Sequence, residues 1–73
     1  MENLGKRLKE CRKAMHLRQE ETAKMLDIGY STYRRYEQSG KGVSFEDAVK
    51  MAKLFHVSLD YLGGLVDEAE TGE

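Results

Sequence analysis

Apolar residues recur at helical spacing along almost the whole chain, and this spacing limits the possible folds more than any other feature. Leu4, Leu8, Cys11 and Met15 are separated by four, three and four positions, a period close to 3.6 that predicts an amphipathic helix over about residues 3–15. Four further helices are expected: residues 19–25, residues 30–38, one after Ser44, and a short one from Ser58 to Gly63-Gly64. No proline interrupts these segments and no strand pattern competes with them. We therefore expect an all-α domain of five helices.

The side chains expected in the core follow the same spacing. In the second helix Thr22, Ala23 and Leu26 share one side, and in the third Tyr33 and Tyr36 form a buried pair. The fourth and fifth helices are expected to bury a stripe of Phe45, Ala48, Val49, Ala52 and Phe55, followed by Leu59 and Leu62. The polar face of the first helix is expected to consist of Lys6, Arg7, Lys9, Glu10 and Lys13.

Residues suited to helix ends stand between these segments. Asp27 tolerates the left-handed conformation that ends a helix, and His16 and His56 are expected in turns. Ser44, with an aspartate three positions later, resembles a capping box, and Ser58 is a second good N-cap.

Length and charge point to one small domain. The chain has 73 residues, and its one cysteine, Cys11, cannot form an internal disulfide, so we expect packing alone to stabilise it, in the cytoplasm. Residues 1–64 contain all 12 Lys and Arg and nine acidic residues, for a net charge of +3, whereas the last nine residues carry −4. We expect a mildly basic domain over residues 1–66 and an acidic, disordered tail over residues 67–73.

The chain offers little chemistry for catalysis or for a bound cofactor. His16 and His56 are interpreted as turn residues rather than metal ligands, and Cys11, on the apolar stripe, as a buried inert thiol. No catalytic motif or glycine-rich phosphate loop is present, and no apolar run approaches the ~20 residues that span a bilayer. We expect no enzyme activity, metal, cofactor, small-molecule ligand or membrane association.

Two helices joined by three or four residues are typical of a helix-turn-helix. The chain carries this pattern in QEETAKMLDIGYSTYRRYE (residues 19–37), with LGKRLK (residues 4–9) upstream and LFHVSLDYL (residues 54–62) downstream. Ala23 supplies the small side chain needed where the two helices cross, and Ile28 the branched apolar residue that fills the turn. Over residues 3–64 the chain closely resembles the phage-repressor-like Cro/C1 (XRE) helix-turn-helix family. This resemblance implies a lambda-repressor-like, five-helix domain that binds double-stranded DNA as a transcriptional regulator, of the phage-repressor kind, and acts as a homodimer on a pseudo-palindromic operator.

The resemblance also implies which residues meet DNA. In the third helix Tyr33 and Tyr36 point one way at 100° per residue, and Ser31, Arg34, Arg35 and Gln38 point the other way. By matching position, the base-reading residues are expected to be Tyr30, Ser31, Arg34 and Arg35, and the backbone-contacting residues Arg18, Gln19, Thr32, Gln38 and Lys41. Arg35 has the chemistry for a bidentate contact to guanine.

Two structural expectations come from the same resemblance. Arg12 of the first helix is expected to form an ion pair with Glu37, since Glu37 lies toward the buried side of the third helix. Tyr33 replaces a usual aliphatic residue, so its hydroxyl needs water or a protein partner. Arg18 stands where the family usually has a Thr or Ser N-cap.

Three interpretations of function stay open at this point. The first is the DNA-binding regulator, whose dimer would form through the C-terminal side, where Tyr61, Leu62, Leu65 and Val66 lie. The second is an antitoxin-like or adaptor protein that acts mainly through a protein partner. The third is the DNA-binding part of a longer regulator.

Overall fold

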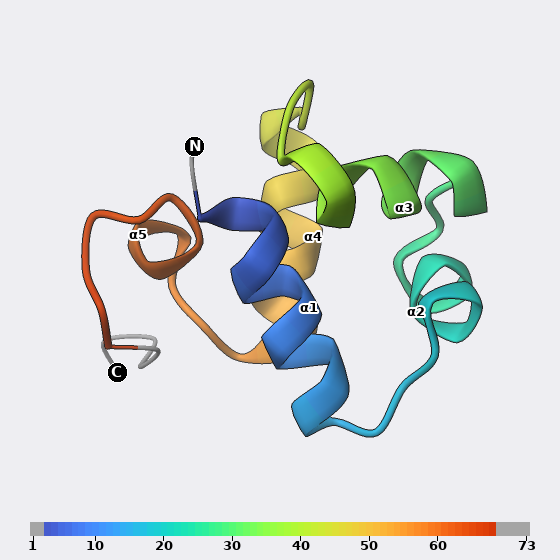
Figure 1. The fold of residues 1–73 in the computed structure, drawn as a ribbon, viewed down its shortest axis with the longest axis horizontal. Coiled ribbons are helices and arrows are strands. Elements are labelled where there is room, and N and C mark those ends of the chain that lie inside the picture. The colour runs from blue at the N-terminus through green and yellow to red at the C-terminus, as the bar shows by residue number, and fades with distance from the viewer. Residues whose placement is uncertain (1–2, 69–73) are drawn as a thin grey trace.

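The computed structural model describes residues 3–68, which form five helices and, within that range, no strand. The helices are α1 (Leu4–Ala14), α2 (Gln19–Leu26), α3 (Tyr30–Ser39), α4 (Phe45–Phe55) and α5 (Leu59–Leu62), as Figure 1 shows. The predicted all-α class and the order of five helices are confirmed. None of the five is long and apolar enough to cross a membrane.

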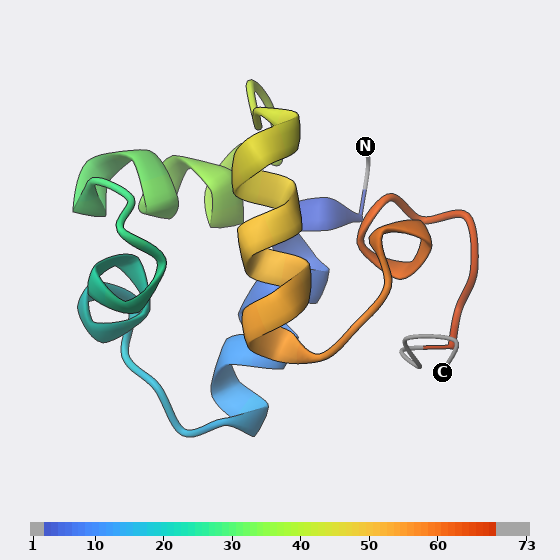
Figure 2. The same cartoon turned by 180° about the vertical axis from the view of Figure 1, so that it is seen from behind.

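The helices pack in two groups around α1 and α4. These two helices cross the middle of the molecule, α1 in front in Figure 1 and α4 in front in Figure 2, with α2 and α3 on one side and α5 on the other. The most deeply buried side chains are Leu4 and Leu8 of α1, Tyr33 of α3, Met51 of α4 and Leu62 of α5. Because α1 touches α3, α4 and α5, it fixes the position of α3 relative to the rest.

The close approach of α1 to α3 depends on Gly5, a residue that the spacing analysis did not single out. A Cβ atom built on Gly5 would overlap the carbonyl oxygen of Glu37, and Gly5 is buried. Backbones of two helices can approach this closely only where one of them carries no side chain. Gly5 therefore sets the distance between α1 and α3.

The predicted helix ends are present. Asp27, His16 and His56 adopt left-handed conformations with φ of 55°, 59° and 57°. The Ser44 hydroxyl accepts a hydrogen bond from the Asp47 N–H at 3.0 Å, and the Ser58 hydroxyl accepts one from the Tyr61 N–H at 2.9 Å. These contacts satisfy N–H groups that a helix start leaves unpaired.

Three positions of the predicted apolar stripes are wrong. Met15 is 39% exposed, Phe45 is 75% exposed, and Leu59 at the start of α5 is 37% exposed. Met15 lies past the end of α1, where Arg12 instead turns inward, and Phe45 lies at the first residue of α4, beyond the part that α1 covers. Met51 fills the core position of α4 that the stripe left out. A periodic pattern gives the direction of a face but not the length over which a partner covers it.

The predicted boundary between the domain and the tail, at residues 66 and 67, lies two residues before the last residue that the structure describes. Residues 69–73 of the predicted acidic tail lie outside the described residues. Asp67, assigned to that tail, is described, and its carboxylate accepts a hydrogen bond from Arg7 at 2.8 Å.

Candidate DNA-binding surface

The turn between α2 and α3 is built by a few short contacts. The Ile28 N–H donates to the Ala23 carbonyl at 3.0 Å after Asp27 has reversed the chain in its left-handed conformation. Ala23 is 2% exposed, and Ile28 packs against the core. Ala23 and Ile28 are therefore buried at the helix crossing and in the turn, as the sequence predicted. Gly29 then starts α3.

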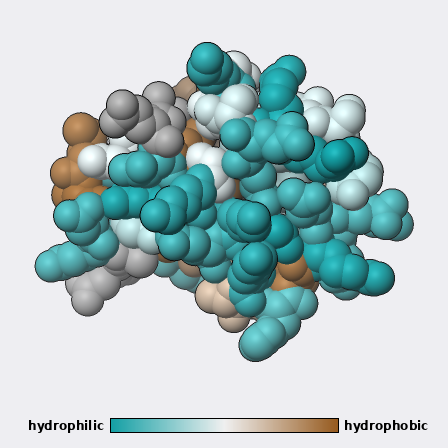
Figure 3. Space-filling view, in the orientation of Figure 1, coloured by the Kyte–Doolittle hydropathy of each residue, from teal (hydrophilic) through white to brown (hydrophobic). Residues whose placement is uncertain are grey.

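The two faces of α3 differ sharply in character. Tyr33, Tyr36 and Glu37 are buried against the rest of the domain. The exposed residues of α3 are Tyr30, Ser31, Arg34, Arg35, Gln38 and Ser39, with Thr32 half-buried at the flank. In Figure 3 the side formed by α2 and α3 is mostly hydrophilic, whereas hydrophobic surface gathers at the opposite edge, near α5. The four predicted base-reading residues thus share one exposed, cationic helix surface.

The two arginines of this surface are held in different places. The guanidinium of Arg34 lies 5.5 Å from the centre of the Tyr30 ring, at the start of α3. The guanidinium of Arg35 lies 5.4 Å from the Tyr36 ring and next to Gly42, in the loop after α3. Stacking on an aromatic ring restricts a long side chain without neutralising it. Both charges therefore remain available to an anionic or polar partner.

The predicted backbone-contacting residues lie on either side of α3. Arg18 and Gln19 are at the start of α2, and Lys41 is in the loop after α3. Arg18 and Lys41 are exposed, and Gln19 is half-buried because its Nε2 donates to Glu37 Oε1 at 3.0 Å. The start of α2 also presents backbone N–H groups, which favour a nearby anion.

Glu21 and Thr22 provide the contacts at the start of α2 that a Thr or Ser at position 18 would otherwise make. The Glu21 carboxylate accepts a hydrogen bond from the Arg18 N–H at 2.9 Å, and the Thr22 hydroxyl donates to the Arg18 carbonyl at 2.9 Å. These two side chains anchor the first turn of α2 from inside the helix, so the Arg18 side chain, 84% exposed, is left on the surface.

Arg12 and Glu37, expected to pair, lie in contact beneath this surface. Arg12 Nε donates to Glu37 Oε2 at 2.7 Å and Nη2 donates to Oε1 at 3.2 Å, with the two side chains 10% and 3% exposed. Burial alone would raise the pKa of Glu37, but the hydrogen bonds from Arg12 and Gln19 outweigh it, so that the pKa of this carboxyl is lowered. A third donor of Arg12, Nη1, binds the Leu17 carbonyl at 2.8 Å. The pair therefore joins α1, α3 and the turn before α2.

The two buried tyrosines of α3 differ in how their hydroxyls are satisfied. The Tyr36 hydroxyl donates to Asp47 Oδ2 at 2.7 Å and ties α3 to the start of α4. The Tyr33 hydroxyl, buried beside Glu37, has no hydrogen-bond partner of good geometry within residues 3–68, and burial followed by the nearby Glu37 charge raises its pKa. The partner that the sequence analysis required for Tyr33 is not provided by these residues.

Neither a metal centre nor a reactive thiol stands out in the described part of the chain. Residues 3–68 contain no group of three or more His, Cys, Asp or Glu side chains that could hold a metal ion. Cys11 is half-buried, and burial raises the pKa of its thiol.

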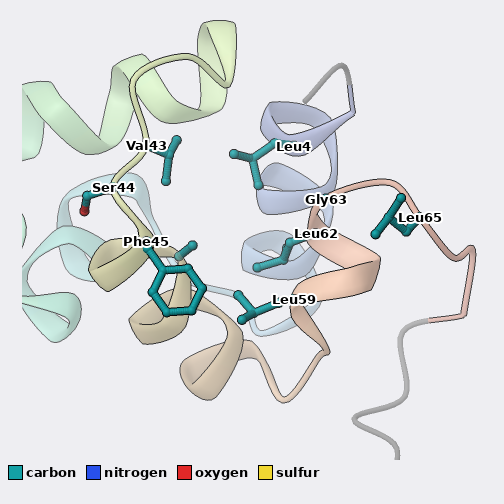
Figure 4. Close-up of a pocket in the computed structure, with 9 residues that line it drawn as sticks. Leu4, Val43, Ser44, Phe45, Leu59, Leu62, Gly63 and Leu65 are labelled. Atoms are coloured by element: carbon teal, nitrogen blue, oxygen red, sulfur yellow. The ribbon is translucent and has the colours of Figure 1, made fainter.

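A second surface lies on the opposite side of the molecule from the α2–α3 surface. It is an apolar groove of about 470 Å³ between the starts of α1 and α4 and the residues around α5. The side chains that line it include Leu4, Val43, Phe45, Leu59, Leu62 and Leu65, which are labelled in Figure 4. Phe45 and Leu65 project from it, 75% and 80% exposed.

The residues predicted to form a dimer contact differ in how exposed they are. Leu62 is 2% exposed and belongs to the core, so its side chain is not available to a partner. Leu65 and Val66 are exposed as expected, and Phe45 and Leu59 join them. Phe45 was missed because its spacing matches the buried stripe of α4.

The sequence is similar to known helix-turn-helix proteins. A family described as helix-turn-helix matches residues 8–62. The HTH-type transcriptional regulator ImmR of Bacillus subtilis is 35% identical over 71 residues, which cover 97% of this chain and 56% of the relative. The uncharacterized HTH-type transcriptional regulator YobD of the same organism is 38% identical over 64 residues, 88% of this chain and 57% of the relative. The chain thus spans a little over half the length of these two relatives. No solved structure matches the chain.

Proposed function

The chain belongs to the Cro/C1-type helix-turn-helix family, and on that premise we propose that it binds a specific sequence of double-stranded DNA and regulates transcription as a repressor of the phage type. The names of the two relatives, both HTH-type transcriptional regulators, support this assignment. The chain spans only part of the length of these relatives. The alternative that it is the DNA-binding part of a longer regulator is therefore kept beside the proposal.

The observation that carries the proposal is the exposed face of α3. An α-helix fits the major groove of B-DNA, which is ~12 Å wide, and reads it with side chains that project away from the protein. The side chains available are Tyr30, Ser31, Arg34 and Arg35. Arg35 can donate two hydrogen bonds to guanine O6 and N7, and Tyr30 can place its ring edge against a thymine methyl.

Contacts to the DNA backbone would flank this helix. We assign them to Arg18 and Gln19 at the start of α2, to Thr32 and Gln38 on the flanks of α3, and to Lys41 in the following loop. The backbone N–H groups at the start of α2 add a favourable field for a phosphate. Such contacts orient α3 in the groove and supply affinity that does not depend on sequence.

Two copies of the chain would act together on a pseudo-palindromic site. One copy offers a single recognition helix, so useful affinity requires a two-fold dimer whose half-sites lie about one helical turn of DNA apart, ~34 Å. We assign the dimer contact to the apolar groove. A two-fold contact brings the same patch together from both sides, and this patch holds projecting side chains (Phe45, Leu65) beside a hollow that could receive them.

The apolar groove also supports the second candidate, a protein whose main partner is another protein. An exposed apolar patch of this kind is a common mark of a protein–protein interface. In that case, the groove would bind the partner, and the surface of α3 would be only a solvated polar face.

Selection from a pool of randomised DNA duplexes tests the proposal against this alternative. The wild-type chain should enrich one pseudo-palindromic motif, and a variant with Arg34→Ala and Arg35→Ala should enrich none. The variant is a fair control because both side chains are exposed, so the fold should be retained. Absence of any enriched motif with the wild-type chain would favour the protein-partner alternative.

A further inference from the structure

Arg7, expected on the solvated face of the first helix, has the richest set of long-range contacts of any side chain in the described residues. Its Nη1 donates to the carbonyls of Tyr61 at 2.5 Å and Val66 at 2.6 Å, and its Nη2 donates to Asp67 Oδ1 at 2.8 Å. The guanidinium also lies 4.3 Å from the centre of the Tyr61 ring, and the side chain is only 12% exposed. A single residue of α1 thus binds α5 through Tyr61 and the end of the segment that follows α5 through Val66 and Asp67.

The start of this C-terminal segment (residues 63–67) is hydrogen-bonded to α5: the Gly63 N–H donates to the Leu59 carbonyl at 2.8 Å, and the Gly64 N–H donates to the Tyr61 carbonyl at 3.1 Å. Gly64 turns the chain with a φ of +84°, and the Leu65 N–H donates to the Asp60 carbonyl at 2.8 Å. The two side chains that follow the turn, Leu65 and Val66, are 80% and 41% exposed. Packing of the segment's own apolar side chains therefore does not hold it in place. Its backbone bonds to α5 fix residues 63–65, and the hydrogen bonds from Arg7 fix Val66 and Asp67 against α1.

The same segment supplies one end of the apolar groove. Leu65 lies just past Gly63, at the other end of the labelled side chains from Phe45, as Figure 4 shows. If the segment were free to move, a second copy would meet Leu59 and Phe45 without Leu65. Ordering a loose segment at the moment of association lowers affinity, whereas a segment already held in place avoids that cost.

We propose that Arg7 is the positioning residue of the dimer contact: it holds residues 63–67 against α1 and so keeps Leu65 and Val66 in place for the second copy. The inference rests on the proposed function, because the apolar groove is assigned to a second copy there.

An arginine suits this role better than a lysine. Its planar guanidinium can stack on the Tyr61 ring while its separate N–H groups reach three oxygens in different directions. A lysine could keep the attraction to Asp67 but not the stacked geometry. Arg7→Lys is therefore expected to weaken the dimer, but less than Arg7→Met does.

The test is the dimer dissociation constant from sedimentation equilibrium for the wild-type chain, Arg7→Met, Arg7→Lys and Asp67→Asn. Arg7→Met should weaken the dimer by roughly tenfold or more, since several residues lose their order, and Arg7→Lys should lie between it and the wild type. Asp67→Asn is the matched control. It removes only the negative charge of the most exposed of the three partners, with the Asp67 side chain 97% exposed, and should change the constant by less than about threefold.

A double-mutant cycle with Leu65→Ser separates positioning from a general loss of structure. Leu65 is so exposed that its replacement should leave the monomer folded, yet weaken the dimer. If Arg7 acts through Leu65, Arg7→Met should have little further effect in the Leu65→Ser background, because the side chain that it positions is gone. Additive effects of the two changes, or an unchanged dimer in Arg7→Met, would overturn the inference.

Failure of the inference and failure of the proposed function give different results. A wild-type chain that enriches a DNA motif but stays monomeric at all concentrations, free and on DNA, would overturn the role of Arg7 and leave DNA reading by α3 intact. Binding of Arg7→Met to a single half-site from the enriched motif should be close to that of the wild type, because the side-chain contacts of Arg7 are with Tyr61, Val66 and Asp67 and not with α3. A parallel loss of half-site binding and dimerisation would also overturn the inference.

Discussion

Gln19 Nε2 donates a hydrogen bond to Glu37 Oε1 at 3.0 Å, and the same carboxylate receives two hydrogen bonds from Arg12. Gln19, proposed to contact a phosphate, is therefore hydrogen-bonded to the buried face of α3, the helix proposed to read bases. In terms of DNA binding, this contact fixes the start of α2 relative to α3, so that a phosphate contact and base contacts come into register together.

The first prediction concerns the stability that the ion pair provides. Arg12→Met should lower the free energy of unfolding by on the order of 3 kcal/mol, because it leaves the Glu37 carboxylate buried without its main partner. Urea unfolding followed by circular dichroism measures the change. Arg18→Met is the matched control: Arg18 also pairs with a glutamate, but its side chain is 84% exposed, and the unfolding free energy should hardly move. Equal effects of the two changes would contradict a structural role for the buried pair.

The second prediction is a dependence of stability on pH. The pKa of Glu37 is lowered in the fold from its usual value of 4.5, so the unfolded chain binds its proton more tightly than the folded one. The stabilisation from Glu37 is therefore complete above the unfolded pKa and is lost as pH falls through the folded pKa. Unfolding free energies measured between about pH 2 and pH 6 should fall less steeply on acidification in Glu37→Gln than in the wild type. An identical slope in both proteins would show that Glu37 does not titrate in this way. Glu21, whose pKa is also lowered, needs a parallel Glu21→Gln control.

The third prediction tests the close approach of α1 to α3. Gly5→Ala should lower the unfolding free energy by about 1–3 kcal/mol, since the added methyl group meets backbone atoms of Glu37 that cannot move aside. Gly29→Ala is the control, because a Cβ there has only the Thr32 hydroxyl as a neighbour, at 3.7 Å. Thermal unfolding that ranks the two variants the other way round would argue against this packing.

These results show which parts of the fold the sequence could predict. Spacing and end-capping residues predicted the five helices and their turns, because Leu4, Ser44 and Asp27 act on neighbours close in the chain. Gly5 and Arg7 were not foreseen in their roles, since the groups they meet lie 32 and 54 or more residues away. A charged residue at an outward position is usually solvated, and no spacing rule predicts that Arg7 donates hydrogen bonds to oxygens of Tyr61, Val66 and Asp67.

The candidate site divides in the same way. The family resemblance indicated the residues on α3, and the exposed face of that helix agrees with them because its buried face is fixed by Tyr33 and Tyr36. The sequence did not predict that Gln19 would bind Glu37, or that Asp47 would bind the Tyr36 hydroxyl as well as cap α4 through its N–H. Both are side-chain contacts between helices, and they depend on the packed arrangement rather than on local preference.

The fourth prediction separates phosphate contacts from base contacts. Lys41→Ala should weaken binding to all duplexes alike and lower the slope of log K against log salt by about one unit per half-site, because each phosphate contact releases about one counterion. Fluorescence anisotropy with labelled duplex at salt concentrations between roughly 50 and 200 mM gives both the binding constant and its salt slope. Lys6→Ala and Lys9→Ala are the controls, since these exposed charges lie on α1 and should change the slope less. A change of sequence preference in Lys41→Ala would contradict a pure backbone contact.

The central claim, that α3 reads DNA sequence, is tested most directly by the ratio of dissociation constants for the enriched duplex and for a scrambled duplex of the same composition. The wild-type chain should prefer the enriched duplex by ~10³-fold or more. Arg35→Ala should lose roughly 1–3 kcal/mol of that preference per half-site and become indifferent at one base pair, while its binding to the scrambled duplex changes much less. A wild-type ratio near one would contradict the account. So would a ratio that Arg35→Ala leaves unchanged while Phe45→Ser or Leu65→Ser abolishes the regulatory activity of the protein, and this second result would favour a protein partner.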